Sequence, residues 1–492
     1  MNGAGLINLS QFRYKDYPHK KVALIHLERK RPWPSCPNPE TGNQWSEDMK
    51  SKIVDIVSKG KFEVFRADQK TKVDDDPSLR QALNECMEAS VDVIVAVQPV
   101  ISDGRLAPVL AQQWGHCLIL WATPEEQKGE MISGNSLVGS HLMTATLRQL
   151  GFPAQFVFGN LDWALAETQL LRAVDVAFAS RYLAKAKVAL IGYQAPGFQD
   201  FHPNPFVMRK TFGTLMLHIG TTEYVQLAKS MKKDVVQNDT DHVLNHLKLP
   251  FKALQTGFGV EEHELDQSSR HYLAMKTLIA DNNLDALAIR CWPELPGPPE
   301  SGGLDQWCYM ALARLATEGF PIACEGDVDG ALGCLIGKFL GCGTIYLSDW
   351  LEHDKETLTL WHGGMAPFQL SEAVGTRLGP CISRHFNNRK AGCLDATIRI
   401  GMEVTIFRFW VFNEQYHVVI MEGRTVKPKR HLLGNNGLVE FEADVDLINS
   451  FEVWLQRGFP HHICVVEGRQ GKKMAAFAEQ SNVKVLEKRL LA

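Results

Sequence analysis

The chain has 492 residues, and at roughly 150 residues per domain this length predicts about three domains rather than one core. Hydrophobic residues make up 45% and charged residues 22%, which is typical of a folded, water-soluble protein and excludes a disordered, collagen-like or coiled-coil chain. With 52 Lys and Arg against 56 Asp and Glu, the net charge of -4 leaves no positive surplus for a phosphate backbone or an anionic membrane, so we expect neither nucleic acid nor membrane as a partner.

The eleven cysteines show no CxxC pair and no repeated spacing, so the sequence predicts neither a zinc ribbon nor a disulfide framework. Free thiols are typical of a reducing compartment. The first residues, MNGAGLINLSQFRYKDY, lack the charged-then-apolar order of a secretory signal. The longest apolar stretch, 330–347, contains five glycines and predicts a buried helix followed by a strand rather than a membrane span. We therefore expect a cytoplasmic protein.

Short β-branched runs alternate with helix-length segments in the first third of the chain. The runs are VALI (22–25), FEVF (62–65), VDVIVAV (91–97) and CLILW (117–121). After the first run, Ser46 is expected to cap a helix that Gly60 ends, and the acidic run before Pro77 is expected to cap the next helix. This βαβ order predicts a parallel sheet with helices on both faces, in a first domain over 1–170.

The same rhythm restarts in the middle of the chain, at KVALIGYQAPGF (187–198), LDALAIRCW (284–292), FPIAC (320–324) and TIYLS (344–348). These runs predict a second doubly wound domain over 171–352. Beyond them, ATIRI, VTIFRFW, YHVVIMEG and LVEFE follow one another without intervening helices, which is typical of an antiparallel barrel or sandwich. The predicted fold class is therefore α/β: two Rossmann-like domains, then a mostly antiparallel β-barrel domain over 353–492 with a last helix near 471–480.

Two acidic residues directly follow consecutive predicted strands of the middle domain: Glu325 follows FPIAC and Asp349 follows TIYLS. A right-handed crossover would make these strands parallel and place both carboxylates at the sheet edge that binds ligands. At a strand spacing of roughly 4.8 Å, the carboxylates repel each other unless a cation or a proton lies between them. The alternative is that Glu325, Asp327 and Asp329 cap the helix that follows.

The β-rich last third supplies histidines for such a site. His362 ends the run TLTLWH, and His461 and His462 open the run HHICVV. Neighbouring strand residues point to opposite faces, so we expect at most one of His461 and His462 to face a given site. A histidine at a strand end is more often a core or surface residue than a ligand. One imidazole beside two carboxylates would favour Mn, Co or Fe over Mg or Ca.

The order CEGD (324–327), LSDW (347–350), LWHGG (360–364) and HHICVVEG (461–468) resembles the L-fucose isomerase and L-arabinose isomerase superfamily. The resemblance extends to KVALIGYQAPGF, IRCWPE and MEVTIFRF and covers the chain from about Val22 to Gly468. It is closer to the fucose isomerase arrangement, because the second acid is an aspartate. It implies an aldose–ketose isomerase, an intramolecular oxidoreductase, that acts on an open-chain monosaccharide with Mn²⁺ or another divalent cation such as Mg²⁺ or Co²⁺.

On the matching residues, the resemblance implies the metal ligands Glu325, Asp349 and His462. Glu325 and Asp349 would also be the acid/base pair that moves a proton between C1 and C2 through an enediolate. His362 and Trp292 are candidate sugar contacts, although Trp292 could equally be a core aromatic. The resemblance further implies a homo-oligomer, often a hexamer.

Two other classes of function stay open at this point. Tandem doubly wound domains also describe sugar-binding proteins, although those are normally exported. Asp327-Val-Asp329 matches the DxD metal site of nucleotide-sugar glycosyltransferases. Neither G-x-G-x-x-G nor a P-loop pattern occurs, so dinucleotide chemistry is not predicted. The sugar also stays open, since fucose, arabinose and a modified hexose such as a sulfosugar differ by small changes in a binding site.

Overall fold

The computed structural model describes residues 20–29, 44–60, 62–67, 72–159, 163–442, 445–487 and 489–490. The amino-terminal segment on which the absence of a secretory signal was judged lies outside these residues. Contacts divide the chain into two compact units, one formed by Asp16–Tyr182 and the other including Leu183–Ala492. No helix within the described ranges is long and apolar enough to cross a bilayer. The three-domain division over 1–170, 171–352 and 353–492 stays a prediction.

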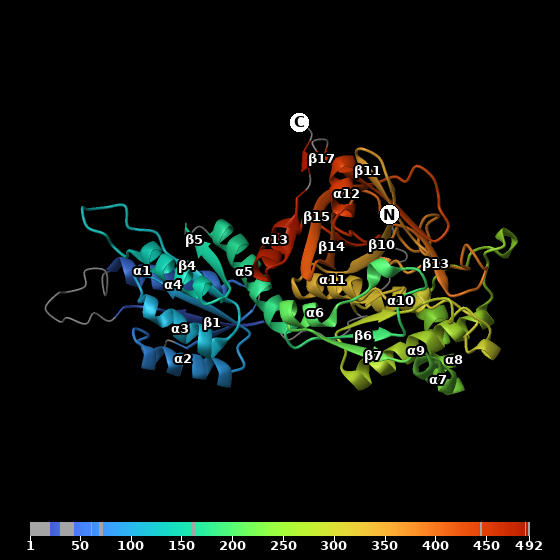
Figure 1. Ribbon diagram of the computed structural model, residues 1–492, viewed down its shortest axis with the longest axis horizontal. Helices are drawn as coiled ribbons and strands as arrows, with labels where there is room; N and C mark the ends of the chain where they lie inside the picture. Colours follow the sequence, from blue (N-terminus) through green and yellow to red (C-terminus); the bar gives the residue numbers. More distant parts are fainter. Residues whose placement is uncertain are drawn as a thin grey trace. The chain divides into compact units, whose positions relative to one another are not determined.

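The first unit is built on a five-stranded parallel sheet with the order β2-β1-β3-β4-β5 (Figure 1). Its strands are β1 (Lys21–His26), β2 (Glu63–Arg66), β3 (Val93–Gln98), β4 (Leu118–Ala122) and β5 (Ala154–Phe158). Its helices are α1 (Gln44–Ser58), α2 (Asp76–Glu88), α3 (Ala107–Val109), α4 (Ser136–Gln149) and α5 (Trp163–Leu183). β3 and β4 are buried along their whole length, as expected where helices cover both faces of a parallel sheet. The predicted βαβ order is confirmed.

The two predicted helix caps of this unit have different outcomes. The Asp75 side chain accepts a hydrogen bond from the Ser78 backbone N–H at the start of α2, so the prediction for the acidic run is confirmed. Ser46 lies inside α1, two residues after its first residue, and is buried. The prediction that Ser46 caps this helix is therefore wrong, because the helix starts before the serine and turns it toward the core.

The second unit begins with a four-stranded parallel sheet of order β7-β6-β8-β9. Its strands are β6 (Lys187–Ile191), β7 (Leu215–Ile219), β8 (Ala286–Ile289) and β9 (Ile322–Ala323). The helices of this part are α6 (Pro205–Phe212), α7 (Thr221–Ser230), α8 (Lys233–His242), α9 (Leu265–Asn282), α10 (Tyr309–Thr317) and α11 (Val328–Phe339). The carboxyl ends of β6, β8 and β9 lead into the loops that carry Phe198, Trp292 and Glu325.

The rest of the second unit is a closed antiparallel barrel, coloured yellow to red in Figure 1. Its ring of strands is β16 (Asn435–Phe441), β11 (Thr357–His362), β10 (Ile345–His353), β18 (His462–Glu467), β14 (Glu403–Phe412) and β15 (Gln415–Val426), and β15 pairs back to β16. Further elements are β12 (Cys381–Ser383), β13 (Cys393–Thr397), β17 (Val445–Asp446), β19 (Lys484–Leu486), β20 (Arg489–Leu490), α12 (Leu447–Leu455) and α13 (Gly471–Gln480). The predicted fold class is confirmed.

One strand lies in a different sheet from the one predicted. The run TIYLS starts β10, which pairs antiparallel with β11 and β18 in the barrel and does not join β9 in the parallel sheet. A short apolar run reads the same in either kind of sheet, so the sequence could not decide between them. Asp349 is therefore a residue within a barrel strand and not the tip of a parallel strand.

Helix α11 lies between the parallel sheet and the barrel. It contacts β6, β8 and β9 on one side and β10, β14 and β18 on the other, so it is buried on all sides, as predicted for this apolar stretch. Small residues allow this close approach, because a Cβ built at Gly333 would lie 3.1 Å from the Cys464 Sγ and one at Gly337 would lie 2.3 Å from the Ile345 side chain. α11 thereby joins the Glu325 loop to the barrel.

Candidate active site

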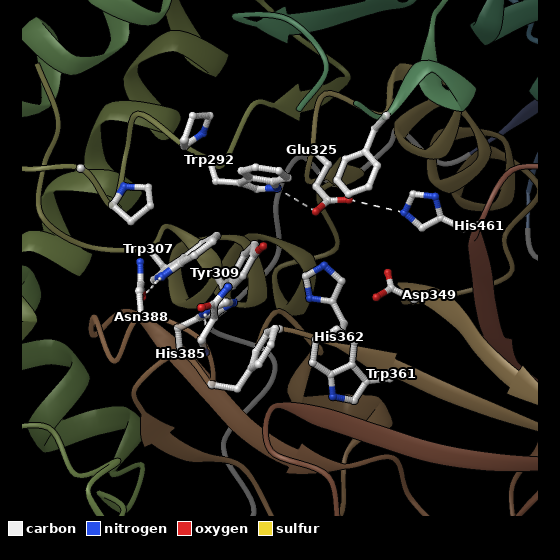
Figure 2. Close-up of a pocket in the computed structure, with 17 residues that line it drawn as sticks. Trp292, Trp307, Tyr309, Glu325, Asp349, Trp361, His362, His385, Asn388 and His461 are labelled. Atoms are coloured by element: carbon white, nitrogen blue, oxygen red, sulfur yellow. Dashed lines mark hydrogen bonds and ion pairs between the residues drawn. The ribbon is translucent and has the colours of Figure 1, made fainter. Parts of the chain in front are cut away.

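A cavity of about 500 Å³ lies where the loops after β6, β8 and β9 face the barrel. Figure 2 shows Glu325, Asp349, His362 and His461 gathered at one end and Trp307, with its neighbours, at the other. The two acidic side chains thus lie at one end of the cavity, and the Trp307–His385 pair lies at the other. Of the sequence-predicted site residues, Glu325, Asp349, His362 and Trp292 line it, and His462 lies behind them, fully buried.

The backbone around Glu325 is tightly constrained. Glu325 has a φ of +57°, a conformation that non-glycine residues rarely adopt, and Gly326 follows with a φ of +76°. A Cβ at Gly326 would lie 2.2 Å from the Tyr193 carbonyl oxygen, so only glycine fits. The Ala195 N–H donates to the Glu325 carbonyl at 2.9 Å. The loop after β6 therefore fixes the Glu325 backbone, a strained arrangement that is common at functional sites.

The Glu325 carboxylate has three ring partners. Trp292 Nε1 donates to Glu325 Oε1 at 3.0 Å, and Oε2 lies 3.4 Å from His462 Nε2 and 3.6 Å from His461 Nε2. Burial opposes ionisation, but the hydrogen bonds from His461, His462 and Trp292 outweigh it and hold the pKa of Glu325 well below its usual range. Glu325 is therefore a carboxylate, positioned to receive a cation.

Asp349 meets His462 through the register of the barrel. The two residues are cross-strand partners in the antiparallel pair β10 and β18, and Asp349 Oδ1 lies 3.2 Å from His462 Nε2. Both predicted carboxylates thus approach the same imidazole nitrogen, although by a different route from the predicted one. Glu325 comes from the parallel sheet, whereas Asp349 and His462 come from the barrel.

Both members of the histidine pair reach Glu325, so the expectation that only one of them faces a site is wrong. β18 begins at His462, and His461 precedes the paired strand, where alternation between faces does not hold. His461 lines the cavity, and its Nδ1 donates to Asp200 Oδ2 at 2.7 Å. Asp200 was not predicted, because nothing in the sequence relates its loop to the distant histidine pair.

His462 is anchored on its far side by a buried ion pair. Its Nδ1 donates to Asp327 Oδ2 at 3.0 Å, and Arg408 makes two hydrogen bonds to the same carboxylate at 2.5 and 2.8 Å. Burial opposes a charged His462, but hydrogen bonds to Asp327, Asp349 and Glu325 raise the pKa of the imidazole above its usual range. Asp327 also caps α11 through the Gly330 N–H, so the predicted capping role is confirmed.

His362 has the opposite hydrogen-bond pattern. Its Nδ1 accepts from the Gly364 N–H at 3.2 Å, which places the proton of the neutral ring on Nε2, beside Cys324 Sγ at 2.9 Å. Burial lowers the pKa of His362 to about 4, so the ring is neutral near pH 7. A nitrogen that carries a proton cannot bind a metal ion. In this tautomer His362 is a neighbour of the site and not a ligand.

Two groups of described side chains bring metal-binding atoms within 4.8 Å of one another, namely Cys324, His362 and His462, and Glu325, His461 and His462. Asp349 belongs to neither group, although it meets His462. The hydrogen bonds of His362 disfavour the first group. Around His462 Nε2, two carboxylates stand within 3.2 to 3.4 Å, a donor set of oxygen and imidazole nitrogen. These residues fit a divalent cation of the Mn type.

The other end of the cavity is built from residues that the sequence analysis missed. Trp307 stacks on His385 with ring centroids 3.8 Å apart, and its Nε1 donates to Asn388 Oδ1 at 2.9 Å. Further missed lining residues include Phe198, Tyr309, Trp361, Phe386 and Asn387. Aromatic faces beside amide groups suit a polyhydroxylated ligand. No sequence motif marks these residues, since Trp307 and its partners His385 and Asn388 lie about 80 positions apart.

The DxD alternative gains no support from the site. Asp327 is bound by Arg408 and His462, and Asp329 accepts from the Tyr416 hydroxyl at 2.7 Å. Both aspartates are buried, and neither lines the cavity. Their carboxylates are therefore taken up by protein partners.

Comparisons with known proteins find sugar isomerases. Sulfoquinovose isomerase from Alkalicoccus urumqiensis is 26% identical to this chain, over 80% of this chain and 86% of that protein. Sulfoquinovose isomerases from Priestia aryabhattai and Clostridium sp. (strain MSTE9) are 23% and 24% identical, over 77% and 81% of this chain and 81% and 87% of theirs. No protein-family model matches the chain. A solved putative response regulator/GGDEF domain protein aligns at a TM-score of only 0.23 and 9% identity, over 65% of this chain and 98% of its own, too low a likeness to bear on fold or function.

Proposed function

We propose a reaction for this chain on the premise that it is a sugar isomerase, an intramolecular oxidoreductase, of the L-fucose and L-arabinose isomerase superfamily. The proposed reaction interconverts an aldose and a ketose in their open-chain forms through an enediolate. The observation that carries the proposal is the convergence of Glu325 and Asp349 on His462 Nε2 beside the cavity. The closer resemblance to fucose isomerase stays a prediction.

Glu325, Asp349 and His462 are the proposed ligands of a divalent cation, with Mn²⁺ as the first choice and Mg²⁺ or Co²⁺ as alternatives. When bound, the ion would polarise the sugar carbonyl and stabilise the negative charge that develops on the substrate oxygens. We assign the ligand role to His462 and not to His461, because His462 meets both carboxylates whereas His461 meets Glu325 and Asp200.

Glu325 and Asp349 also supply the proton chemistry in this proposal. One carboxylate takes the proton from C2 and returns it at C1, and the other serves the oxygens. Trp292 donates to one oxygen of Glu325 and His461 lies 3.6 Å from the other, and both contacts restrict the rotation of the carboxylate. The individual roles of Glu325 and Asp349 stay unassigned, because carboxylates around one imidazole titrate as a unit.

The sugar is proposed to lie along the cavity, with C1 and C2 at the carboxylate end and the remaining carbons toward Trp307 and His385. Trp292 and His362 line the cavity and are the proposed sugar contacts at the reacting end. The names of the relatives make sulfoquinovose, a sulfonated hexose, the first substrate to test. L-fucose and L-arabinose are the next two, on the predicted resemblance. We also retain the prediction of a homo-oligomer.

A substrate panel tests the proposal. Metal-free protein is incubated with each aldose before and after addition of Mn²⁺, and ketose formation is followed by NMR. We expect one of the sugars to be converted only after Mn²⁺ is added. The proposal is contradicted if none of the sugars is converted, or if a metal chelator does not slow the conversion.

Two substitutions extend this test to the carboxylates. Glu325→Gln and Asp349→Asn should abolish turnover and leave the thermal unfolding temperature close to that of wild type, because both side chains border the cavity and not the hydrophobic core. Asp354→Asn is a matched control, since Asp354 is exposed and pairs with Lys429. Normal isomerisation in either of the first two variants would reject the assignment of that residue.

A further inference from the structure

Asp327 gathers polar groups from three parts of the second unit. Its Oδ1 accepts from the Gly330 N–H in α11 at 2.8 Å and from Arg408 in β14 at 2.8 Å. Its Oδ2 accepts from Arg408 at 2.5 Å and from His462 Nδ1 at 3.0 Å. The side chains of Asp327 and His462 are completely buried and that of Arg408 is 1% exposed, so water cannot replace any of these bonds. Capping α11 requires one oxygen, and the second oxygen serves the imidazole.

This carboxylate decides which nitrogen of His462 carries a proton. An ionised carboxylate only accepts hydrogen bonds, and Arg408 keeps Asp327 ionised by donating to both of its oxygens. His462 Nδ1 therefore donates to Asp327, and Nε2 is the nitrogen that faces Glu325 and Asp349 and would meet an ion bound between them. His362 shows the contrast within the same site, since a backbone N–H on its Nδ1 leaves the proton on Nε2.

We propose that Asp327 is a positioning residue, which fixes the ring orientation and the tautomer of His462 so that Nε2 faces Glu325 and Asp349. The inference rests on the proposed metal site and goes beyond it, because it assigns a buried aspartate that touches neither the cavity nor the substrate. Arg408 is the anchor, since its two hydrogen bonds prevent the carboxylate from rotating away from the imidazole.

The geometry predicts the effect of Asp327→Asn in detail. The Gly330 N–H requires an acceptor, so the amide oxygen takes the place of Oδ1 and the amide NH₂ takes the place of Oδ2. The NH₂ group then donates toward His462 Nδ1, which selects the tautomer that carries its proton on Nε2. Binding of the ion at Nε2 then first requires a shift to the other tautomer, although the helix cap is retained. Replacing such outer partners of a ligating histidine typically lowers metal affinity by about 10- to 100-fold.

The test measures Mn²⁺ binding by isothermal titration calorimetry, with no substrate present. Asp329→Asn is the matched control, because Asp329 lies in the first turn of the helix that Asp327 caps, is buried, and bonds to Tyr416 instead of His462. A second variant, Asp327→Asn with Arg408→Met, removes the buried pair as a unit, so that no uncompensated charge prevents folding. We expect a dissociation constant for Mn²⁺ raised about 10- to 100-fold in both Asp327 variants and raised less than about threefold in Asp329→Asn.

The outcomes separate this inference from the proposed function. If wild-type protein binds Mn²⁺ and the folded Asp327 variants bind it as tightly as Asp329→Asn does, then Asp327 only supports the fold and the inference is overturned, while the metal site stands. If wild-type protein binds no Mn²⁺, both fail together. A wild-type crystal structure with Mn²⁺ needs no variant. We expect Nε2 on the ion and Nδ1 on Asp327, and a ring ligated through Nδ1 would overturn the inference.

Discussion

Replacing the Trp292 indole, which donates to Glu325, by a phenyl ring tests the role of Glu325 without changing any ionisable group. In Trp292→Phe the aromatic ring keeps its edge contact with Phe198, whose centroid lies 5.6 Å away, but the hydrogen bond to Glu325 Oε1 at 3.0 Å is lost. A hydrogen bond to a charged group contributes about 1.5 to 3 kcal/mol. Since each 1.36 kcal/mol corresponds to a tenfold change in rate, kcat/KM should fall by roughly 10- to 150-fold.

Trp361→Phe is the matched control for this experiment. Trp361 lines the same cavity and also donates one hydrogen bond from Nε1, to the Leu433 carbonyl at 2.8 Å, but it does not bond to Glu325. We expect kcat/KM of this variant within about threefold of wild type, which corresponds to roughly 0.6 kcal/mol. The assay is steady-state isomerisation with saturating Mn²⁺, and thermal unfolding verifies that both variants fold. Equal losses in the two variants, or no loss in Trp292→Phe, would refute the reasoning.

Three further predictions concern other contacts. His461→Asn removes the ring that lies 3.6 Å from Glu325 Oε2 and should lower kcat/KM by about tenfold, or about 1.4 kcal/mol, while Mn²⁺ affinity stays within a few-fold; loss of calorimetric Mn²⁺ binding would make His461 a ligand. Arg314→Met should cost about 3 to 5 kcal/mol in urea unfolding, because Asp239, whose side chain is only 10% exposed, loses two charge-assisted hydrogen bonds of 2.7 Å; exposed Arg80→Met should cost under about 1 kcal/mol, and equal costs would contradict this. Burial lowers the pKa of His271 to about 4. The neutral ring therefore contributes its full stabilisation above pH 6.5, and about 3 kcal/mol of the free energy of unfolding is lost as the pH falls from 6.5 to 4. The same pH dependence of the free energy of unfolding in wild type and in His271→Asn would contradict this.

The fold was predictable because its elements are local patterns. Each apolar run of the first sheet became a parallel strand, and Gly471–Gln480 became the last helix. The sheet to which β10 belongs was not predictable, since IYLS is apolar in the way that a parallel or an antiparallel core strand would be. β11 follows β10 directly, but the pairing with β18 depends on contacts with residues more than 100 positions away.

The candidate site was likewise predictable from the sequence only in part. Glu325 and Asp349 were marked by their positions directly after apolar runs, and His462 by its match to the superfamily motif. Asp200, Trp307 and His385 carry no such mark, because their partners lie in other loops. The paired approach of His461 and His462 was missed because the alternation rule was applied across the point where the strand begins.

The central claim is that the carboxylates of Glu325 and Asp349 carry a proton between C1 and C2 of an open-chain aldose. Uptake of solvent deuterium at C2 of the aldose, followed by NMR in wild type and in both amide variants, tests it most directly. The account predicts Mn²⁺-dependent exchange in the wild type and none in Glu325→Gln or Asp349→Asn at equal Mn²⁺ occupancy. Exchange that persists in both variants would contradict it.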